Sequence, residues 1–406
     1  MMEGKGTEDL NLGELRKIID FSRGSSESDV GFGDLDRSGK LVKFAPVSAI
    51  TTARMTFCFA TAKILEIDGC EPLVTRGIEA LGTSLRDSSG GGWYSSFDDA
   101  RGTRVKSAYQ NSFVLLASAA AESSGDSSAR ELIDESIRVI EQHFWNDKLG
   151  ILWDEFSEDF SEPKKYLGAN SNMHAVEALL AASNVLKDES LVERADMIAE
   201  FFINKQARAH DWKLPEHFDE HGEPDLDYGR DKPNDVFKPY GVTIGHLFEW
   251  SRLLLELDFA SRTPAPWRRE ASLALFETAK RLGWNADGMP GFVYTTDFDE
   301  NVVVPTRLHW VACEALAAAS SINSWSLGSS SDASETVWSS YLFDAFRDSK
   351  LGGWHHELDP HGVPSELMFQ GKPDAYHLMH GMLIPQLPKG SGLVDRIQRS
   401  KGQSRW

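Results

Sequence analysis

Histidines and carboxylates occur near the start of several apolar stretches that have helical spacing. His174 is followed three residues later by Glu177, and His246 by Glu249, so each pair lies on one face of a helix. His377 occupies a similar place in a third stretch. Imidazoles can transfer protons near neutral pH because their unperturbed pKa is about 6.5. These residues are therefore candidates for general acid–base chemistry.

Other polar residues occur in the same part of the predicted helices. They are Arg54, Tyr109, Asn170, Asn172, Arg307, Glu314, Asp374, Tyr376 and His380. Burying such groups without partners would cost about 1–3 kcal/mol each. If all the helices begin at one end of a barrel, the polar groups instead converge on one axial pocket, which is a common place for a ligand site. We therefore expect a shared site.

Two other interpretations of these residues stay open. A single histidine on an apolar helix is usually a core residue with a satisfied hydrogen bond, and His309 fits that role best. His355 and His356 alternate on a predicted hairpin and are expected to be exposed. The His-x-x-Glu and His-x-x-His spacings could also bind a metal, but the sequence has no HExxH motif. We expect no metal site.

Six short segments resemble one another and predict β-hairpins. Most contain glycine, then an aromatic residue, then alternating residues and an acidic tip with Gly or Asn. The segments are residues 31–40, 91–102, 150–160, 211–222, 290–302 and 352–362. They recur about every 60 residues, with one gap of about 80. The sequence between them has the apolar periodicity of paired helices.

Six helical pairs can close into a ring, so the sequence predicts an all-α protein with an (α/α)6 barrel and short β-hairpins on one rim. The helices at 107–121, 170–184 and 307–321 are rich in small residues and suit the inner layer. Those at 131–145 and 190–205 carry a charged stripe and suit the outer layer. Closure of the ring lets the whole chain be one domain.

Composition limits the other properties of the chain. We expect a single domain over residues 1–406, with flexible ends at 1–28 and 398–406. The net charge of −20 argues against nucleic acid as a partner, and no apolar run reaches the 18–20 residues of a membrane span. Three scattered cysteines and a polar N-terminus favour a cytoplasmic location. Association into a homo-oligomer stays open.

Four stretches carry a resemblance to a known family. They are YLGANSNMHAVEALLAA, FKPYGVTIGHLFEWSRLLLEL, RLHWVACEALAAA and GKPDAYHLMHGMLIPQLP. In this order they resemble the N-acylglucosamine 2-epimerase superfamily, and within it the aldose–ketose isomerases. Matching blocks run from about residue 30 to residue 390. The family fold, an (α/α)6 barrel, agrees with the fold predicted from the repeats.

The resemblance implies roles for individual residues. His246 and His377 match the two histidines that move protons, His174 matches a third histidine for ring opening or hydroxyl binding, and Glu249 matches a carboxylate that orients its neighbour. The implied substrate-binding positions are Arg54, Tyr109, Asn170, Trp310, Trp93 and Lys238.

The implied reaction is the interconversion of D-mannose and D-fructose, with D-lyxose and D-xylulose as a further pair, through a cis-enediol. No cofactor is expected because no hydride leaves the monosaccharide. A sulfoquinovose isomerase stays open as an alternative and would need a cation for the sulfonate, for which Arg54, Lys238 and Arg307 are candidates.

Three further alternatives also stay open. Two opposed histidines could catalyse sugar 2-epimerisation. An (α/α)6 glycosidase would need paired carboxylates, for which Glu177, Glu249 and Asp374 are candidates. A sugar-binding protein without catalysis would use the same pocket.

Overall fold

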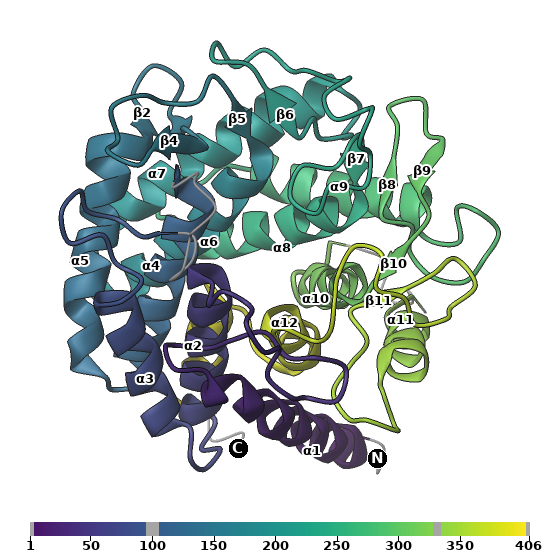
Figure 1. The fold of residues 1–406 in the computed structure, drawn as a ribbon. Coiled ribbons are helices and arrows are strands. Elements are labelled where there is room, and N and C mark those ends of the chain that lie inside the picture. The colour runs from purple at the N-terminus through teal and green to yellow at the C-terminus, as the bar shows by residue number, and fades with distance from the viewer. Residues whose placement is uncertain (1–3, 95–104, 328–333, 403–406) are drawn as a thin grey trace.

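The helices form two concentric rings in the computed structural model, which describes residues 4–94, 105–327 and 334–402 (Figure 1). Each inner helix packs against the next along the chain, and the last packs against the first. Within the described residues the inner helices are α2 (Ala49–Ile64), α4 (Ala108–Ser123), α6 (Ala169–Leu186), α8 (Ile244–Ala260), α10 (His309–Ser324) and α12 (Tyr376–Leu383). The ring is therefore closed.

The outer ring consists of α1 (Gly4–Ser22), α3 (Glu71–Gly82), α5 (Arg130–Val139), α7 (Glu189–Ala199), α9 (Trp267–Gly283) and α11 (Ser334–Tyr341). Each of α3 to α11 packs on the inner helix that precedes it, and α1 packs on α12 and α2. Three outer helices, α5, α7 and α11, continue into the π-helical segments Ile140–Phe144, Glu200–Ala207 and Leu342–Phe346. The predicted (α/α)6 barrel is confirmed.

The predicted assignment of helices to layers is also confirmed. Residues 108–121 of α4 and 244–257 of α8 are buried without interruption. Alanine and serine allow the neighbours of α4 to approach closely, whereas the large apolar residues of α8 fill space on both sides. A helix that is buried all round must belong to the inner layer.

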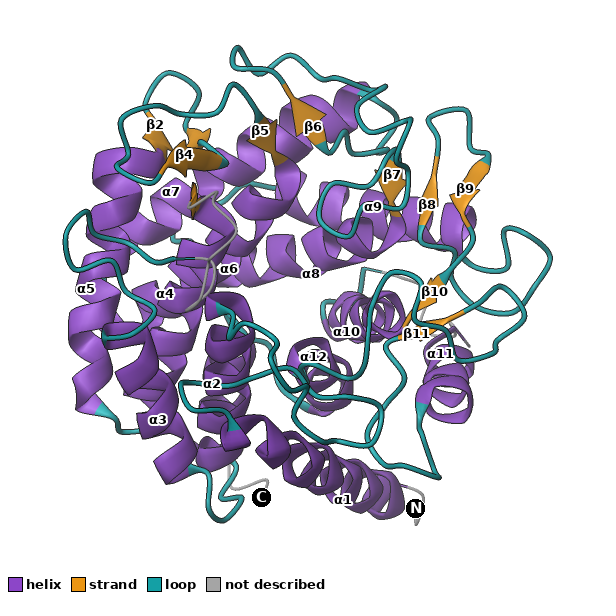
Figure 2. Ribbon diagram, viewed as in Figure 1, coloured by secondary structure: helices purple, strands orange, loops and turns teal. Residues whose placement is uncertain are grey.

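Short antiparallel strands connect the helices at one rim (Figure 2). The pairs are β1 (Val105–Ser107) with β4 (Glu155–Ser157), β2 (Trp145–Asn146) with β3 (Ile151–Leu152), β5 (Leu167–Gly168) with β6 (His217–Phe218), β7 (Val242–Thr243) with β8 (Thr295–Thr296), β8 with β9 (Val302–Val304), and β10 (Arg307–Leu308) with β11 (Glu357–Leu358). Most of the predicted hairpin at 91–102 lies outside the described residues.

The acidic tips of the hairpins have a structural role. The side chain of Asp219 accepts hydrogen bonds from the backbone N–H groups of His221 and Glu223, at 2.8 and 3.0 Å. Asp359 accepts in the same way from His361 and Val363. Such bonds hold the backbone in a tight turn. The acidic tips predicted from the sequence are therefore turn-forming residues.

The hairpins also fix where the inner helices begin. The backbone N–H of Ala169 donates to the carbonyl of Glu216 at 2.9 Å, and that of Ile244 donates to Tyr294 at 3.1 Å. Ala108 and His309 make equivalent bonds to the carbonyls of Asp154 and His356. Each of these four helices is thus tied to the hairpin of the next repeat, so one residue of that hairpin stands beside its first turn.

Parts of both chain ends pack against the barrel. Leu15, Ile18 and Ile19 of α1 are buried, and Ile397 and Ser400 are buried in α13 (Leu393–Gly402), which packs against α2 and α6. The apolar side chains at helical spacing explain why these parts of 1–28 and 398–406 pack against the barrel. None of the described helices is both long and apolar enough to cross a membrane.

A fully buried arginine, Arg252 of α8, lies among four glutamates inside the barrel. Its guanidinium is 3.1 Å from both Glu314 and Glu256, 3.6 Å from Glu249 and 3.8 Å from Glu177. These carboxylates come from α6, α8 and α10. Because charges in a buried site must be balanced, Arg252, with Arg396 at 3.2 Å from Glu256, allows them to coexist.

Replacement of Arg252 is therefore expected to destabilise the fold strongly. Arg252→Met should lower the free energy of unfolding by about 3–5 kcal/mol, since it leaves buried carboxylates without their cation. Urea denaturation would measure the change. Arg230→Met is the control, because Arg230 pairs with Asp227 on the surface and should contribute at most about 1 kcal/mol. Equal stabilities of the two variants would contradict the role of Arg252.

Candidate active site

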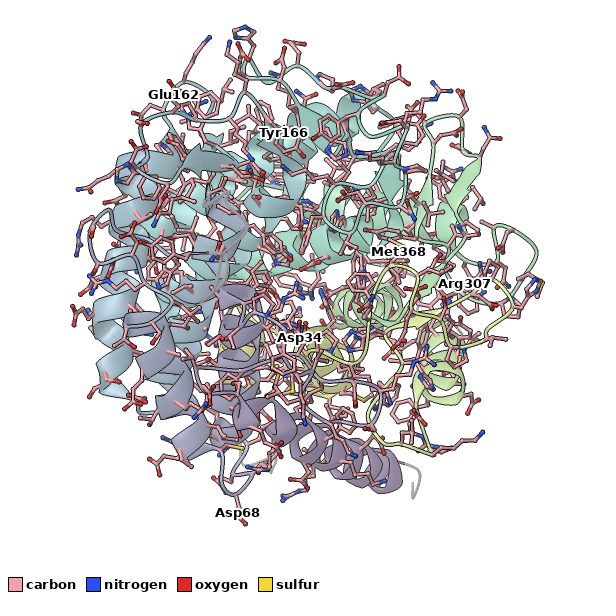
Figure 3. The ribbon with its side chains drawn as sticks, viewed as in Figure 1. Asp34, Asp68, Glu162, Tyr166, Arg307 and Met368 are labelled. Carbon is pink, nitrogen blue, oxygen red and sulfur yellow. The ribbon has the colours of Figure 1, made fainter. Side chains whose placement is uncertain are left out.

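A cavity of about 340 Å³ opens at the rim where the inner helices begin. This volume falls within the range of small-molecule sites. Figure 3 shows Asp34, one of its lining residues, near the middle of the ring. The cavity is lined by eight of the predicted site residues, namely Arg54, Tyr109, Asn170, His174, His246, Glu249, Trp310 and His377. The predicted convergence of these residues is therefore observed.

His246 is held by a carboxylate from a hairpin. Its Nδ1 lies 2.9 Å from Oε1 of Glu216, the residue just before β6. The prediction that Glu249 orients His246 was wrong, because a side chain from another element takes that place. An ionised carboxylate can only accept a hydrogen bond, so Nδ1 carries the proton. The other ring nitrogen, Nε2, is left as a base.

His377 is held in the same way by a glutamate of α10. Its Nδ1 lies 2.9 Å from Oε1 of Glu314. Burial lowers the pKa of His377 to about 3, although Glu314 acts in the opposite direction. Burial alone would raise the pKa of Glu314, but Arg252 and the bond from His377 bring it to about 2. At neutral pH the pair is thus a neutral imidazole and a carboxylate.

The indole of Trp310 lies beside both of these histidines. Its ring centroid is 5.5 Å from that of His246 and 5.3 Å from that of His377. Gly245 keeps this arrangement open, because a Cβ atom at that position would lie 2.1 Å from the indole. Two imidazole bases therefore face one cavity with an aromatic surface between them.

His174 and Glu249 are close to each other but are not hydrogen-bonded. His174 Nδ1 is 3.7 Å from oxygens of both Glu177 and Glu249, and burial lowers the pKa of His174 to about 4. The carboxyl oxygens of Glu249 have no hydrogen-bond partner among the described residues. Burial and the nearby Glu314 raise the pKa of Glu249 well above its usual range. Burial thus favours the protonated form of Glu249.

Arg54 supplies positive charge to the cavity. Its guanidinium donates to Asp374 Oδ2 at 3.1 Å and to the hydroxyl of Tyr109 at 2.7 Å, and it lies over the ring of Phe113. Burial would raise the pKa of Asp374, but Arg54 outweighs it and holds that pKa well below the usual range. Among the described residues that line the cavity, Arg54 is the only cationic side chain.

Two predicted binding residues do not line the cavity. Trp93 is 2% exposed and belongs to the core, where its indole N–H donates to the carbonyl of Leu81 at 2.7 Å. Lys238 is neutralised by Asp154 and Glu155, at 3.2 and 3.0 Å. Both side chains therefore stabilise the protein around the site and leave the cavity to other residues.

A third predicted cation, Arg307, was a candidate for binding a sulfonate. It lies away from the middle of the ring in Figure 3 and pairs with Asp287 at 2.6 Å. With Lys238 also paired elsewhere, two of the three candidate cations are outside the cavity wall.

Two further histidines were assigned other roles from the sequence but line the cavity. His309 was expected to be purely structural, and His356 was expected to be exposed; both are buried, and their ring centroids are 4.1 Å apart. Burial lowers the pKa of His309 to about 4. His355 is partly exposed and lies 3.7 Å from Asp348. The alternation of the hairpin was predicted correctly, but its inward face meets the cavity.

Sequence reasoning missed Glu216 and Tyr294 altogether. Both occupy the hairpin position whose carbonyl accepts the first N–H of an inner helix. The signal was present, since each lies two residues after a buried apolar residue of its hairpin, Leu214 or Phe292. Alignment of the hairpins on these residues would have placed both side chains near the helix starts.

Comparison with known proteins places the chain in a family. The model of the N-acylglucosamine 2-epimerase (GlcNAc 2-epimerase) family matches residues 31–381. The chain belongs to this family. It is 39% identical to a D-mannose isomerase of Pseudomonas cannabina pv. alisalensis over 95% of this chain and 94% of that protein.

Two other relatives support this placement. A D-mannose isomerase of Thermobifida fusca is also 39% identical, over 95% of each chain. A crystal structure of D-mannose isomerase superposes with a TM-score of 0.86 at 25% identity, covering 95% of this chain and 99% of the other.

The hydrogen bond between Glu216 and His246 leads to a prediction for activity. Glu216→Gln should lower kcat by about 10–100-fold, because the amide cannot stabilise a positively charged His246 as the carboxylate does. Steady-state kinetics would measure this. Glu220→Gln changes a partly exposed glutamate of the same hairpin that pairs with Lys165, and it should leave kcat unchanged. Equal activity of the two variants would show that Glu216 has no part in the reaction.

The buried histidines lead to a prediction for stability. Unfolded histidines take up protons below about pH 6.5, whereas folded His174 and His309 stay neutral until about pH 4. Their contribution to stability is therefore complete above pH 6.5 and is lost as the pH falls towards 4. His309→Gln should reduce the slope of unfolding free energy against pH by about 1.4 kcal/mol per unit in this window. Denaturation curves with identical slopes would refute this.

Proposed function

We propose that this protein is an aldose–ketose isomerase that interconverts D-mannose and D-fructose without a cofactor. The observation that carries the proposal is the pair of imidazoles, His246 and His377, on one cavity. Each has its Nδ1 on a carboxylate and lies beside Trp310. The identity to two D-mannose isomerases over nearly the whole chain supports the choice of substrate.

The reaction needs two proton transfers, for which two bases are present. One imidazole removes the proton from C2 of the open-chain aldose and returns it to C1, on the same face of the cis-enediol. The other moves a proton from O2 to O1. Each becomes positively charged in turn, and the carboxylate on its Nδ1 stabilises that charge. General acid–base catalysis of this kind contributes about 10²–10⁴-fold.

The negative charge of the enediolate needs a compensating group. Arg54 supplies a fixed positive charge in the cavity and is held in place by Asp374 and Tyr109. Charge that is already oriented before the reaction stabilises a transition state at little reorganisation cost. His174, which is neutral at pH 7, is suited to binding a sugar hydroxyl or to assisting ring opening.

The electrostatics of the cavity favour a neutral sugar over an anionic one. Arg54 is already paired with Asp374, while the other candidate cations, Lys238 and Arg307, are paired outside the cavity. The described lining also includes the carboxylate of Asp34. A sulfonate or phosphate would therefore find little free positive charge there, which argues against sulfoquinovose as the preferred substrate.

The carboxylates also argue against a glycosidase. Glu177 is bound to Tyr376 and lies 3.0 Å from His380, and Asp374 is bound to Arg54. Glu249 lies 3.7 Å from His174, and Asp34, another carboxylate of the described lining, accepts a hydrogen bond from Thr51 at 3.0 Å. Hydrolysis of a glycosidic bond needs a pair of free carboxylates on either side of the bond.

Incubation with D-mannose in D₂O tests the proposal directly. We expect NMR to show D-fructose as the product, with any incorporated deuterium at its C1. The activity should persist in the presence of EDTA, and D-lyxose should be turned over more slowly than D-mannose. His377→Asn serves as the inactive control. Formation of D-glucose without fructose would instead show a 2-epimerase, and faster turnover of sulfoquinovose than of D-mannose would refute the preference for a neutral sugar.

A further inference from the structure

Tyr294 is a cavity residue with a firmly fixed backbone. It precedes β8 in the fifth hairpin; its N–H donates to Val304 at 2.9 Å, and its carbonyl accepts from Ile244 at 3.1 Å. Its ring meets that of Trp310 edge-on, with centroids 6.0 Å apart. The side chain is 2% exposed and lines the cavity. Its position is therefore set by the same hydrogen bonds that start helix α8.

The hydroxyl of Tyr294 makes no hydrogen bond with any described residue, unlike those of two neighbouring tyrosines. The Tyr109 hydroxyl accepts from Arg54, and the Tyr376 hydroxyl donates to Glu177. Buried tyrosine hydroxyls normally have a partner, and leaving one without costs about 1–3 kcal/mol. The Tyr294 oxygen is not sealed in the interior, so its partner can come from the cavity side.

The surroundings of Tyr294 suit a hydrogen-bond donor rather than a proton-transfer group. Burial and the carboxylate of Glu216 raise the pKa of Tyr294 well above the ordinary value of 10. The side chain therefore remains a phenol throughout the useful pH range. Glu216 holds His246, and Trp310 lies between the two bases, so Tyr294 stands next to the part of the cavity where a substrate must sit.

We propose that Tyr294 determines specificity by hydrogen bonding to one hydroxyl group of the aldose. The inference rests on the proposed function. It adds a residue that recognises the substrate by a hydrogen bond but takes no part in proton transfer. A site that provides a buried partner for a hydroxyl discriminates against an analogue lacking it, because the protein group is then left unpaired.

A comparison of substrates in Tyr294→Phe tests the proposal. The substitution removes one oxygen and keeps the ring, so D-mannose should lose about 10-fold in kcat/KM. The 3-deoxy, 4-deoxy and 6-deoxy analogues of D-mannose would be measured in parallel. For one of these analogues, the kcat/KM of the wild type divided by that of the variant should fall to about 1, because the hydroxyl that Tyr294 binds is already absent. An equal ratio for all the sugars, or an unchanged kcat/KM for D-mannose, would overturn the proposal.

Two further measurements separate this role from a structural one. The melting temperature of Tyr294→Phe should equal or exceed that of the wild type, since no protein hydrogen bond is lost; a lower value with equal sugar ratios would mean a packing role. Tyr341→Phe is the control, because Tyr341 packs on Trp284 and Phe346 outside the cavity lining, and it should leave all the ratios unchanged.

The role of Tyr294 can also be tested separately from the proposed isomerase activity. D-mannitol cannot be isomerised because it has no carbonyl, and its dissociation constant can be followed by tryptophan fluorescence. Tyr294→Phe should raise that constant about 10-fold. Absence of fructose formation by the wild type would refute the proposed function, whereas equal D-mannitol affinities of the two proteins would refute the role of Tyr294.

Discussion

The site depends on the balance of charge around Arg252. This guanidinium has no exposed surface and is shared by Glu314, Glu256, Glu249 and Glu177. Without it, the buried carboxylate of Glu314 would lose the cation that keeps it ionised. Arg252 lowers the pKa of Glu314, so that Glu314 stays ionised. The Glu314 carboxylate then accepts a hydrogen bond from Nδ1 of His377 and keeps the proton on that nitrogen. A buried structural ion cluster thus sets the protonation state of a group on the cavity wall.

Much of the fold could be predicted because its signals are local and repeated. Apolar residues at helical spacing identified the helices, and small side chains identified the inner layer. The acidic tips recur because each turn needs an acceptor for the same backbone N–H groups, as Asp219 and Asp359 show. Closure of the ring followed from the number of repeats, and it placed His174, His246 and His377 on one cavity.

What the sequence did not reveal are contacts between elements. Spacing of i and i+3 suggested that Glu249 orients His246, but Glu216 reaches it from a hairpin 30 residues earlier. Lys238 was predicted to bind substrate because it is a cation near the site, but two acidic residues of another hairpin bind it first. The partner of a charged side chain depends on distances across the fold, which periodicity does not encode. Trp93 illustrates the same limit for packing, since its indole faces the core.

The two histidine–carboxylate pairs are supported by different parts of the molecule. Glu314 belongs to an inner helix and is continuous with the ion cluster, whereas Glu216, also buried, belongs to a rim connection. Replacement of the Glu216 side chain would therefore leave the carboxylates around Arg252 in place. Alteration of the His377 pair would disturb the interior of the barrel. The orientation of His377 is thus coupled to the charge balance of the interior, and that of His246 is not.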